Sequence, residues 1–409
     1  MMLFTRPLPF EEAIESRRAK ALLPTSLSSR ELDALAPELR EQSLYSARTN
    51  SLQHLSRIDS IIGKMVDPTG ERGDSWDPSR ARIAIRESLE QIGYDPADIN
   101  AIPGSLKDLG SERRINLILD TNVKMARGYG NWTQGQDPAV LDQWPGSELV
   151  RHEGRTQERT DWPARFIAAG ATLHGGRMIA LKDDPVWKRL SRFGLPYPPF
   201  DYNSGMGLDD VDRDECMRLR LIDRDRQLTP QTRPFHDNPP LSGPPQVRAK
   251  DFSPLLDAAA RQLGPRYGIQ GGALVKRAWS ALTAPDRIAA GSKAMQQALA
   301  TQGDVIDALW REDTGSIDLR WGDENKGIAH ILKRRDEDRQ LHGTGATGIE
   351  MVNMLPEIIV HGTAAESAGK ITVKHDGYTA VLARKWNQRE VARWVLTAFD
   401  PRPGKGRER

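Results

Sequence analysis

Residues 162–211 constrain the fold of this chain most strongly, because they combine many tryptophan, proline and glycine residues with no sustained helical or strand period. Turn-forming pairs such as Gly175-Gly176, Asp184-Pro185 and Pro198-Pro199 interrupt any long regular element. Large apolar side chains lie between these turns: Trp162, Phe166, Met178, Ile179, Leu181, Trp187, Leu190, Phe193, Tyr197 and Phe200. We therefore predict a compact, irregular module that packs around its own apolar side chains.

The residues before this module predict a mostly helical region. Apolar spacing indicates helices at residues 10–23, 28–60 and 81–93, the last following the start signal Asp77-Pro78-Ser79. A further helix is predicted from Ser111 onward, since its apolar residues recur at intervals of three and four. Each of these helices is expected to bury one apolar stripe against a partner.

Asn122 is a polar residue on the apolar face of this last helix. Burying an unpaired amide costs free energy, so we expect its side chain to bond a neighbouring backbone group. A functional site built from Asn122 and Arg127 is the alternative interpretation. We favour a role for Asn122 in fixing the position of the helix.

The character of the sequence changes after Ile222. Residues 223–250 contain six prolines, which predicts an extended linker. Ser253-Pro254 is a favourable helix start, and two further alanine-rich helices are predicted at 272–282 and 286–301. We interpret residues 251–302 as a small helical spacer.

The last hundred residues predict a small α+β domain. The sequence indicates a strand at 316–321 and a helix at 326–335, and then a second helix that opens with a capping box from Thr347 to Glu350. Asp376-Gly377 separates two alternating apolar runs, which is a strong hairpin signal, and a third strand is predicted at 393–399. These elements describe two helices with an antiparallel meander.

The predicted fold class is therefore multidomain α+β. It comprises a mostly helical N-terminal part with an irregular Trp/Pro-rich module, and a small C-terminal α+β domain with an antiparallel meander. The predicted segments are a helical region at 1–66, the central module at 80–222, the linker at 223–250, the spacer at 251–302, the α+β domain at 303–400 and a disordered tail at 401–409.

Charge and composition exclude several classes of protein. The 58 basic and 56 acidic residues give a formal net charge of +2, so the whole chain has no bias toward polyanions. Cys216 is the only cysteine, which excludes internal disulfides and cysteine-built zinc sites. No run approaches the roughly 18 apolar residues of a membrane span, so no membrane partner is expected. The first residues lack the apolar region of a secretory signal, which predicts a cytoplasmic origin.

A metal site is one possible interpretation of His174, Asp183 and Asp184. Two adjacent carboxylates on one strand cannot both face the same ion together with a lone histidine. We therefore favour roles for these residues in turns and helix caps, and expect no metal site.

The predicted helix at 326–335 carries a candidate site for phosphoryl chemistry. Its spacing directs Ile328, Ile331 and Leu332 toward the sheet and places His330, Lys333 and Arg334 on an adjacent face. Imidazole titrates near neutral pH, and a guanidinium can hold phosphate oxygens in a bidentate fashion. The alternative is that these are solvated side chains suited to a helix C-terminus.

The central region resembles the phage head morphogenesis family of Mu F-like minor head proteins. The resemblance lies in RRINLILDTNVKMARGYGNWTQGQDP, DWPARFIAAG, GGRMIALKDDPVW and SRFGLPYPPFDYNSGMGLDDV, with Trp187, Pro198, Pro199 and Asn203 at the matching positions. Many members have a cysteine motif where this chain has Ser204-Gly205-Met206. The resemblance implies a virion protein that acts in capsid and portal assembly or in DNA packaging and delivery, with portal and capsid proteins as partners.

The C-terminal region resembles the phage-associated nucleases of the barnase/EndoU/colicin/RelE clan, through KGIAHILKRR, LPEIIVHG and RWVLTAFD. The resemblance implies a metal-independent endoribonuclease that needs no cofactor, binds RNA and reaches the host cytoplasm. In that role His330 would be the acid/base residue, Arg334 the phosphate clamp and Thr397 a hydroxyl at the scissile phosphate. The substrate-binding candidates are Lys326, Lys333, Arg335 and Trp394.

Two functional interpretations remain open. Residues 304–409 contain equal numbers of basic and acidic residues, so RNA would have to meet a local basic patch rather than a basic domain. Candidates for that patch are Lys326, Lys333, Arg334, Arg335, Arg384, Lys385, Arg389 and Arg393. The first interpretation is a head protein with an active ribonuclease; the second is a purely structural head protein whose last domain is an inactive binding module.

Overall fold

The computed structural model describes residues 10–67, 76–99, 101–231, 253–386 and 389–400, which form two compact units. Unit 1 comprises residues 1–259 and 270–274, and unit 2 comprises residues 260–269 and 275–409. The predicted tail at 401–409 and residues 232–250 of the predicted linker lie outside the described residues. Each unit is described by itself below.

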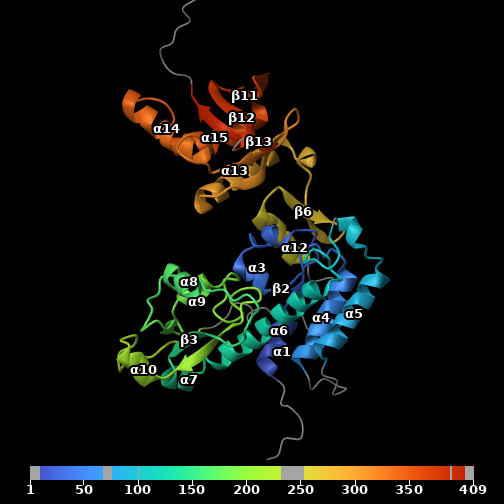
Figure 1. Ribbon diagram of the computed structural model, residues 1–409, viewed down its shortest axis with the longest axis vertical. Helices are drawn as coiled ribbons and strands as arrows, with labels where there is room; N and C mark the ends of the chain where they lie inside the picture. The colour runs from blue at the N-terminus through green and yellow to red at the C-terminus, as the bar shows by residue number, and fades with distance from the viewer. Residues whose placement is uncertain (1–9, 68–75, 100, 232–252, 387–388, 401–409) are drawn as a thin grey trace, which may run out of the picture. The chain divides into compact units, whose positions relative to one another are not determined.

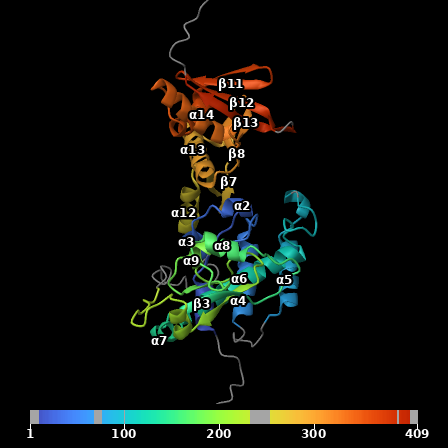
Figure 2. The same cartoon turned by 60° about the vertical axis from the view of Figure 1, so that its left-hand side comes forward.

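Four helices of unit 1 pack around its largest core: α1 (Glu11–Arg18), α4 (Leu52–Val66), α5 (Pro78–Gln91) and α6 (Glu112–Gln134). Ile58, Ile62, Ile85 and Ile115 are almost fully buried in this core. Figures 1 and 2 show α4 and α6 alongside each other. Shorter elements complete this part: β1 (Ala21–Leu22), α2 (Ser29–Leu32), α3 (Pro37–Glu41), β2 (Ser43–Leu44) and the 3-10 helix η1 (Pro96–Ile99).

Two predicted helices of this region are confirmed. Asp77 caps α5 by accepting hydrogen bonds from two backbone N–H groups, and Pro78 occupies the first helical position. Ser111 caps α6 by accepting a hydrogen bond from the Arg114 N–H. The predicted partner of Asn122 is also present, because its Nδ2 donates to the Ile118 carbonyl at 2.9 Å.

The single helix predicted at 28–60 is wrong. The chain forms α2, α3 and β2 before α4 begins at Leu52. Pro37 is the main physical reason, since proline lacks an N–H group and begins a helix readily but does not continue one. The helix predicted at 10–23 also ends early, at Arg18, because Ala21 and Leu22 pair in parallel with Ser43 and Leu44.

The Trp/Pro-rich stretch forms the predicted compact module. Trp162, Phe166, Trp187 and Phe200 are almost fully buried in one cluster. The elements of this module are α7 (Pro138–Gln143), β3 (Gly146–Arg151), α8 (Trp162–Ala168), β4 (Ile179–Leu181), α9 (Val186–Leu190), β5 (Met206–Val211) and α10 (Arg213–Arg218). The three strands form an antiparallel sheet in the order β4-β3-β5, which leaves β5 at an edge.

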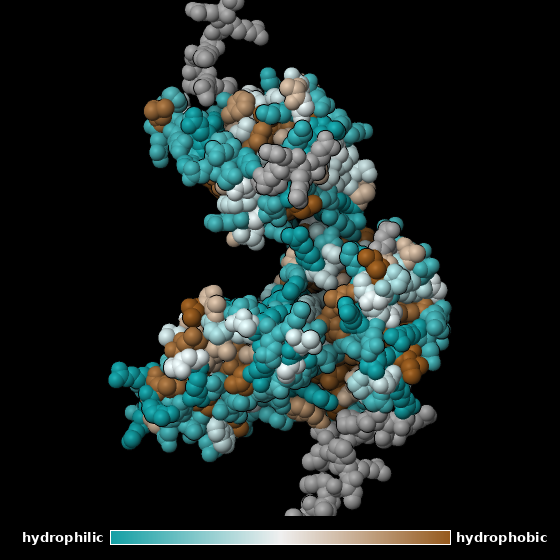
Figure 3. Space-filling view, viewed as in Figure 1, coloured by the Kyte–Doolittle hydropathy of each residue, from teal (hydrophilic) through white to brown (hydrophobic). Residues whose placement is uncertain are grey.

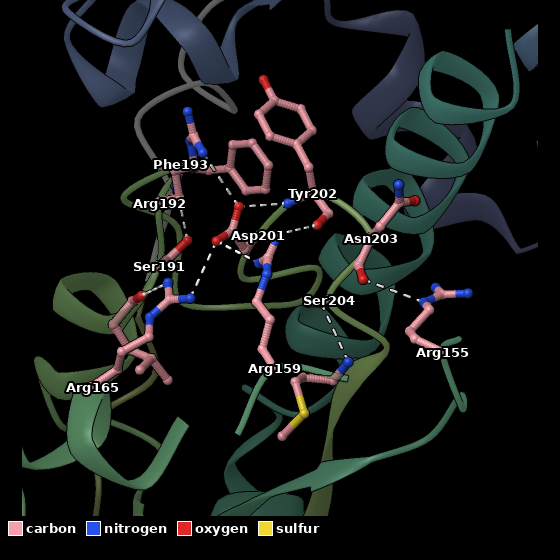
Figure 4. A network of polar contacts seen from close by, with 12 residues as sticks. Arg155, Arg159, Arg165, Ser191, Arg192, Phe193, Asp201, Tyr202, Asn203 and Ser204 are labelled. Carbon is pink, nitrogen blue, oxygen red and sulfur yellow. Dashed lines mark hydrogen bonds and ion pairs between the residues drawn. The ribbon is translucent and has the colours of Figure 1, made fainter. Parts of the chain in front are cut away.

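A buried carboxylate holds the corner between α9 and β5. Figure 4 shows Arg159, Arg165 and Arg192 converging on Asp201, with N–O distances of 2.7, 3.1 and 3.8 Å. Asp201 also accepts a hydrogen bond from the Tyr202 N–H at 2.7 Å. Because Asp201 is only 11% exposed, loss of its arginine partners would leave a buried carboxylate without compensation, so this corner depends on the cluster.

Unit 2 is an α+β fold, as predicted. Its six strands lie in the order β10-β11-β12-β13-β9-β8, antiparallel except where β13 meets β9. Figures 1 and 2 show the strands in one layer and the helices in another. The elements are β8 (Val305–Arg311), β9 (Gly315–Leu319), α14 (Gly327–His342), α15 (Gly348–His361), β10 (Thr363–Ser367), β11 (Lys370–His375), β12 (Tyr378–Trp386) and β13 (Arg389–Phe399).

Several local predictions for unit 2 are confirmed. Asp376 and Gly377 form the hairpin turn with positive φ angles of 46° and 84°. Thr347 and Glu350 form the predicted capping box. Strands β8 and β10 were not predicted, although each forms a hairpin with the next strand in the sequence. The exposed sequence TAAES of β10 has no apolar alternation, and an irregularity at Asp307, whose φ is 56°, interrupts the alternation of β8.

The residues before β8 differ from the predicted spacer helices. Helix α12 (Ser253–Leu263) and helix α13 (Ala284–Thr301) are present, but the helix predicted at 272–282 is wrong. Positive φ angles at Gly271 and Gly272 allow a turn between β6 (Tyr267–Gln270) and β7 (Ala273–Lys276), which the short 3-10 helix η3 (Trp279–Ala281) follows. Met295 and Ala298 of α13 are buried in the core of unit 2.

Hydrophilic side chains cover most of the visible face of each unit (Figure 3). Exposed large apolar side chains include Ile102 and Leu341, which lie far apart in the sequence. Such isolated apolar residues are normal on protein surfaces. Within the part of the chain that the structure describes, no helix is both long and apolar enough to cross a membrane.

His54 makes the stability of unit 1 depend on pH. Its side chain is 2% exposed, and Nδ1 lies 3.0 Å from the Ser88 hydroxyl. Burial lowers the pKa of His54 from 6.5 to about 4. The folded chain therefore resists protonation that the unfolded chain accepts below pH 6.5, so stability is retained above that pH and falls as the pH drops toward 4.

We predict that the free energy of unfolding of the wild type falls by about 2 kcal/mol more than that of His54→Gln between pH 7 and pH 5. Urea unfolding followed by tryptophan fluorescence at both pH values measures the difference. An equal pH dependence in the two proteins would contradict the assignment to His54.

Candidate active site

A tight loop connects β9 to α14 and fixes the start of this helix. Gly322 and Gly327 have positive φ angles of 74° and 84°, and their Cα atoms approach each other closely. The N–H groups of Ile328 and Ala329 donate to the carbonyls of Arg320 and Trp321 at 3.0 and 2.9 Å. These bonds satisfy the first N–H groups of α14, which no capping side chain reaches.

The loop orients His330 by a single short hydrogen bond. Nδ1 of His330 lies 2.6 Å from the backbone carbonyl oxygen of Glu324. A carbonyl oxygen can only accept, so Nδ1 carries the proton in the neutral ring and the Nε2 lone pair remains available as a base. The side chain is half-buried, on the turn of α14 nearest the loop. This arrangement gives His330 the tautomer and the orientation that general base catalysis needs.

The two neighbouring cations are exposed and each meets a carboxylate. Lys333 Nζ lies 3.0 Å from Glu324 Oε1, and this hydrogen bond raises the pKa of Lys333. Arg334 reaches Glu337 and Asp338 at 3.5 and 3.4 Å. Exposed ion pairs of this kind contribute little to stability, so a phosphate group can replace the carboxylates at small cost.

Arg335 lies on the other side of α14 and is buried. Its guanidinium contacts Asp338 at 2.7 Å and Asp400 at 3.4 Å, while Asp400 accepts a hydrogen bond from the Ala346 N–H at 2.9 Å. Arg335 therefore connects α14 to the loop before α15 and to the end of β13. The structure places this substrate-binding candidate in a structural contact.

Thr397 and Trp394 lie on β13 and face away from the helices. Val395 and Ala398 point into the core with Ile328, and a bulge in the β12–β13 pairing sets Thr397 beside Val381 on the opposite face of the sheet. Trp394 is 2% exposed, and its indole N–H donates to the Lys385 carbonyl at 3.1 Å. The structure thus groups His330, Lys333 and Arg334, and it separates them from Thr397 and Trp394 by the sheet.

The remaining candidates occupy varied positions. Lys326 is the residue before α14, and its carbonyl accepts from the Asp323 N–H at 3.0 Å. Arg393 is buried beside Glu366 at 3.1 Å. Arg384 and Lys385 are exposed, whereas the side chain of Arg389 lies outside the described residues.

Sequence reasoning missed two exposed lysines on the open face of the sheet. Strand register places Lys374 of β11 beside Thr379 of β12. In the same way, Thr372 lies beside Val381, and Val381 in turn pairs with Thr397 of β13. Lys370 lies in the next row of the same face. The alternation of KITVKH carries this signal, because residues two apart share a face of a strand.

The residues weighed as a metal site take turn and cap positions. Asp184 accepts a hydrogen bond from the Val186 N–H at 2.7 Å at the start of α9, and Asp183 meets Arg226 at 3.1 Å. His174 lies in a turn closed by backbone bonds with Arg177. Across the described ranges, no group of three or more His, Cys, Asp and Glu side chains is arranged to hold a metal ion.

We predict that Gly327→Ala displaces the loop and the His330 imidazole. A Cβ atom at this position would meet the Arg320 carbonyl oxygen at 2.6 Å in a left-handed backbone, so we expect a loss of at least about 2 kcal/mol in unfolding free energy. Gly343→Ala is the matched control, since Gly343 is also left-handed but borders open space and should lose only about 1 kcal/mol. Equal losses in the two variants, measured by thermal unfolding, would show that the close approach is unimportant.

Comparison with known families supports the assignment of the C-terminal region. Residues 308–404 match the family described as phage-Barnase-EndoU-ColicinE5/D-RelE like nuclease1. The comparisons give no support to the resemblance of the preceding region to head morphogenesis proteins. No curated protein and no solved structure shows a significant match to the chain. The matched stretch contains α14, α15 and most of the sheet, so the chain carries a phage-associated nuclease-like domain at its C-terminal end.

Proposed function

We propose that the C-terminal domain is a metal-independent endoribonuclease in which His330 is the general base. The observation that carries this proposal is the 2.6 Å hydrogen bond from His330 Nδ1 to the Glu324 carbonyl. It leaves Nε2 unprotonated and directs it away from the loop. The match of residues 308–404 to a nuclease family supports the same reaction class.

The chemistry follows from the groups on α14. Nε2 of His330 removes the proton of an RNA 2′-OH, and the 2′-oxygen attacks the adjacent phosphorus. The bond from phosphorus to the 5′-oxygen breaks, which yields a 2′,3′-cyclic phosphate and a 5′-OH. Solvent supplies the proton of the leaving oxygen, and His330 later returns its own proton to solvent. Arg334 holds the non-bridging oxygens and stabilises the charge that develops on them.

RNA binding in this proposal is local and electrostatic. Phosphates replace Glu324 at Lys333 and replace Glu337 and Asp338 at Arg334, since these ion pairs are exposed. Lys326 extends the same patch toward the loop. On the open face of the sheet, Lys370 and Lys374 offer a second path for the backbone, with Thr397 beside it. Binding should therefore weaken as salt increases.

The alternative function is an inactive module that only binds capsid, portal or nucleic acid. Specific observations favour it: Trp394 is buried and unable to stack on a base, and Thr397 faces away from α14. Arg335 is held by two carboxylates. A domain of this kind would bind RNA and leave it intact.

For unit 1 we propose a role as a minor head protein of a phage or prophage, located in the virion, with portal and capsid proteins as partners. The support is the sequence resemblance of residues 111–211. Co-expression with the portal protein of the same phage tests this role, because a stable complex is expected on size exclusion. Elution of the two proteins as separate species would contradict it.

The ribonuclease proposal is tested with the full chain and total bacterial RNA in EDTA. We expect the wild type to cleave and His330→Ala to lose at least about 100-fold of the rate, the scale of general base catalysis. His342→Ala is the matched control, since His342 is an exposed histidine at the other end of α14 and should retain the full rate.

Product analysis separates the proposal from its alternative. The proposed mechanism gives cyclic phosphate ends, and a substrate with deoxyribose at the cleavage site should remain intact. RNA that binds but is never cleaved would establish the binding module. Cleavage that His330→Ala leaves unchanged would sink the mechanism.

A further inference from the structure

Unit 1 contains a large cleft that the proposed nuclease does not use. Its volume is about 870 Å³, within the range of ligand-binding sites. One wall is α6, the opposite wall is β5, and aromatic side chains that include Trp132, Trp187 and Tyr197 also line it. At Gly128 the helix contacts the Pro198 carbonyl, a contact that any side chain at this position would block.

The wall formed by β5 is the free edge of the sheet. The Leu149 N–H donates to the Met178 carbonyl, so the backbone groups of Leu149 point toward β4. Successive residues of a strand turn these groups to opposite sides, so the residues of β3 on either side of Leu149 bond β5. In this register Gly207 and Asp209 turn their backbone groups toward β3, while Leu208 and Asp210 turn theirs outward. The His152 N–H bonds the Gly205 carbonyl, which fits the same alternation. The cleft thus borders backbone donors and acceptors for which the described residues show no partner.

The dimensions of the cleft suit an extended segment. Asp120, Lys124, Arg127, Asn131 and Gly135 lie on one face of α6, which runs for about 22 Å along the cleft. The lining part of β5, residues 206–210, extends for about 16 Å. A peptide of five or six residues in strand conformation has this length.

The charge at the mouth of the cleft favours a basic segment. Asp209 and Asp210 are 61% and 57% exposed, whereas their partners in the lining are more enclosed. Lys182, which meets Asp210 at 2.8 Å, is only 8% exposed. Asp120 and Glu153 show the same relation to Lys124 and Arg155, which are 28% and 27% exposed, so four carboxylates stand outward of the side chains that pair with them.

We infer that this cleft binds an extended segment of a partner protein, which adds to β5 as a fourth strand. Leu208 and Asp210 supply the backbone hydrogen bonds, as an exposed sheet edge does in other peptide complexes. Alternate side chains of the segment are apolar and point toward the aromatic lining. The intervening ones are lysine or arginine and meet the outward carboxylates.

The test uses the full chain and a fluorescent acetylated Lys-Val-Lys-Val-Lys-Val amide, with binding followed by anisotropy. Two further peptides carry N-methyl groups on the two alternate sets of amides. Only one set faces β5, so one methylated peptide should bind at least ten-fold more weakly and the other nearly as well as the parent. A Glu-Val repeat of the same length should also bind at least ten-fold more weakly.

Two variants locate the site. Asn131→Trp fills the cleft from an exposed position of α6 and should weaken binding at least ten-fold. Arg113→Trp is the control, because Arg113 is exposed on α6 outside the cleft lining and should leave binding unchanged. Absence of binding, equal binding by both methylated peptides, or dimerisation of the chain that Asn131→Trp abolishes would each overturn the proposal.

Discussion

The close approach of Gly322 to Gly327 is the constraint on which the candidate active site depends. It lets the loop after β9 turn back on the start of α14, so that main-chain carbonyls rather than a capping side chain satisfy the first N–H groups of the helix. The same turn brings the Glu324 carbonyl to His330 Nδ1. A backbone contact, and no neighbouring carboxylate, therefore decides which nitrogen of the ring acts as the base.

Dense polar clusters have different roles in the two units. In unit 1 three arginines converge on the buried carboxylate of Asp201 and hold a corner of the chain, so this cluster is structural. In unit 2 Lys333 and Arg334 remain on the surface, where ligands can displace their carboxylate partners. The exposure of the carboxylate distinguishes the two cases, since Asp201 is 11% exposed whereas Glu324 and Glu337 are 76% and 48% exposed. Trp162 and Trp187 of the central module are also buried, so they are packing residues rather than part of a surface site.

Local signals in the sequence were sufficient for much of the fold. Ser111, Thr347 and Asp376-Gly377 each set a helix start or a turn through bonds to near neighbours, and the structure confirms them. Strands β8 and β10 escaped prediction because their sequences lack a regular apolar alternation: β10 is the exposed run TAAES, and an irregularity at Asp307 interrupts β8. For the site, the shared face of His330, Lys333 and Arg334 followed from helical spacing. The burial of Arg335 beside Asp400 did not, since 65 residues separate the two.

The central claim is that the Glu324 carbonyl fixes His330 as the Nδ1–H tautomer with an unprotonated Nε2. Long-range proton–nitrogen NMR of the histidine-labelled full chain tests it most directly, at a pH where the imidazole is neutral and with His330→Gln to assign the signal. The account predicts a protonated Nδ1 and a Nε2 shift typical of a bare lone pair. A spectrum with the proton on Nε2 would contradict it.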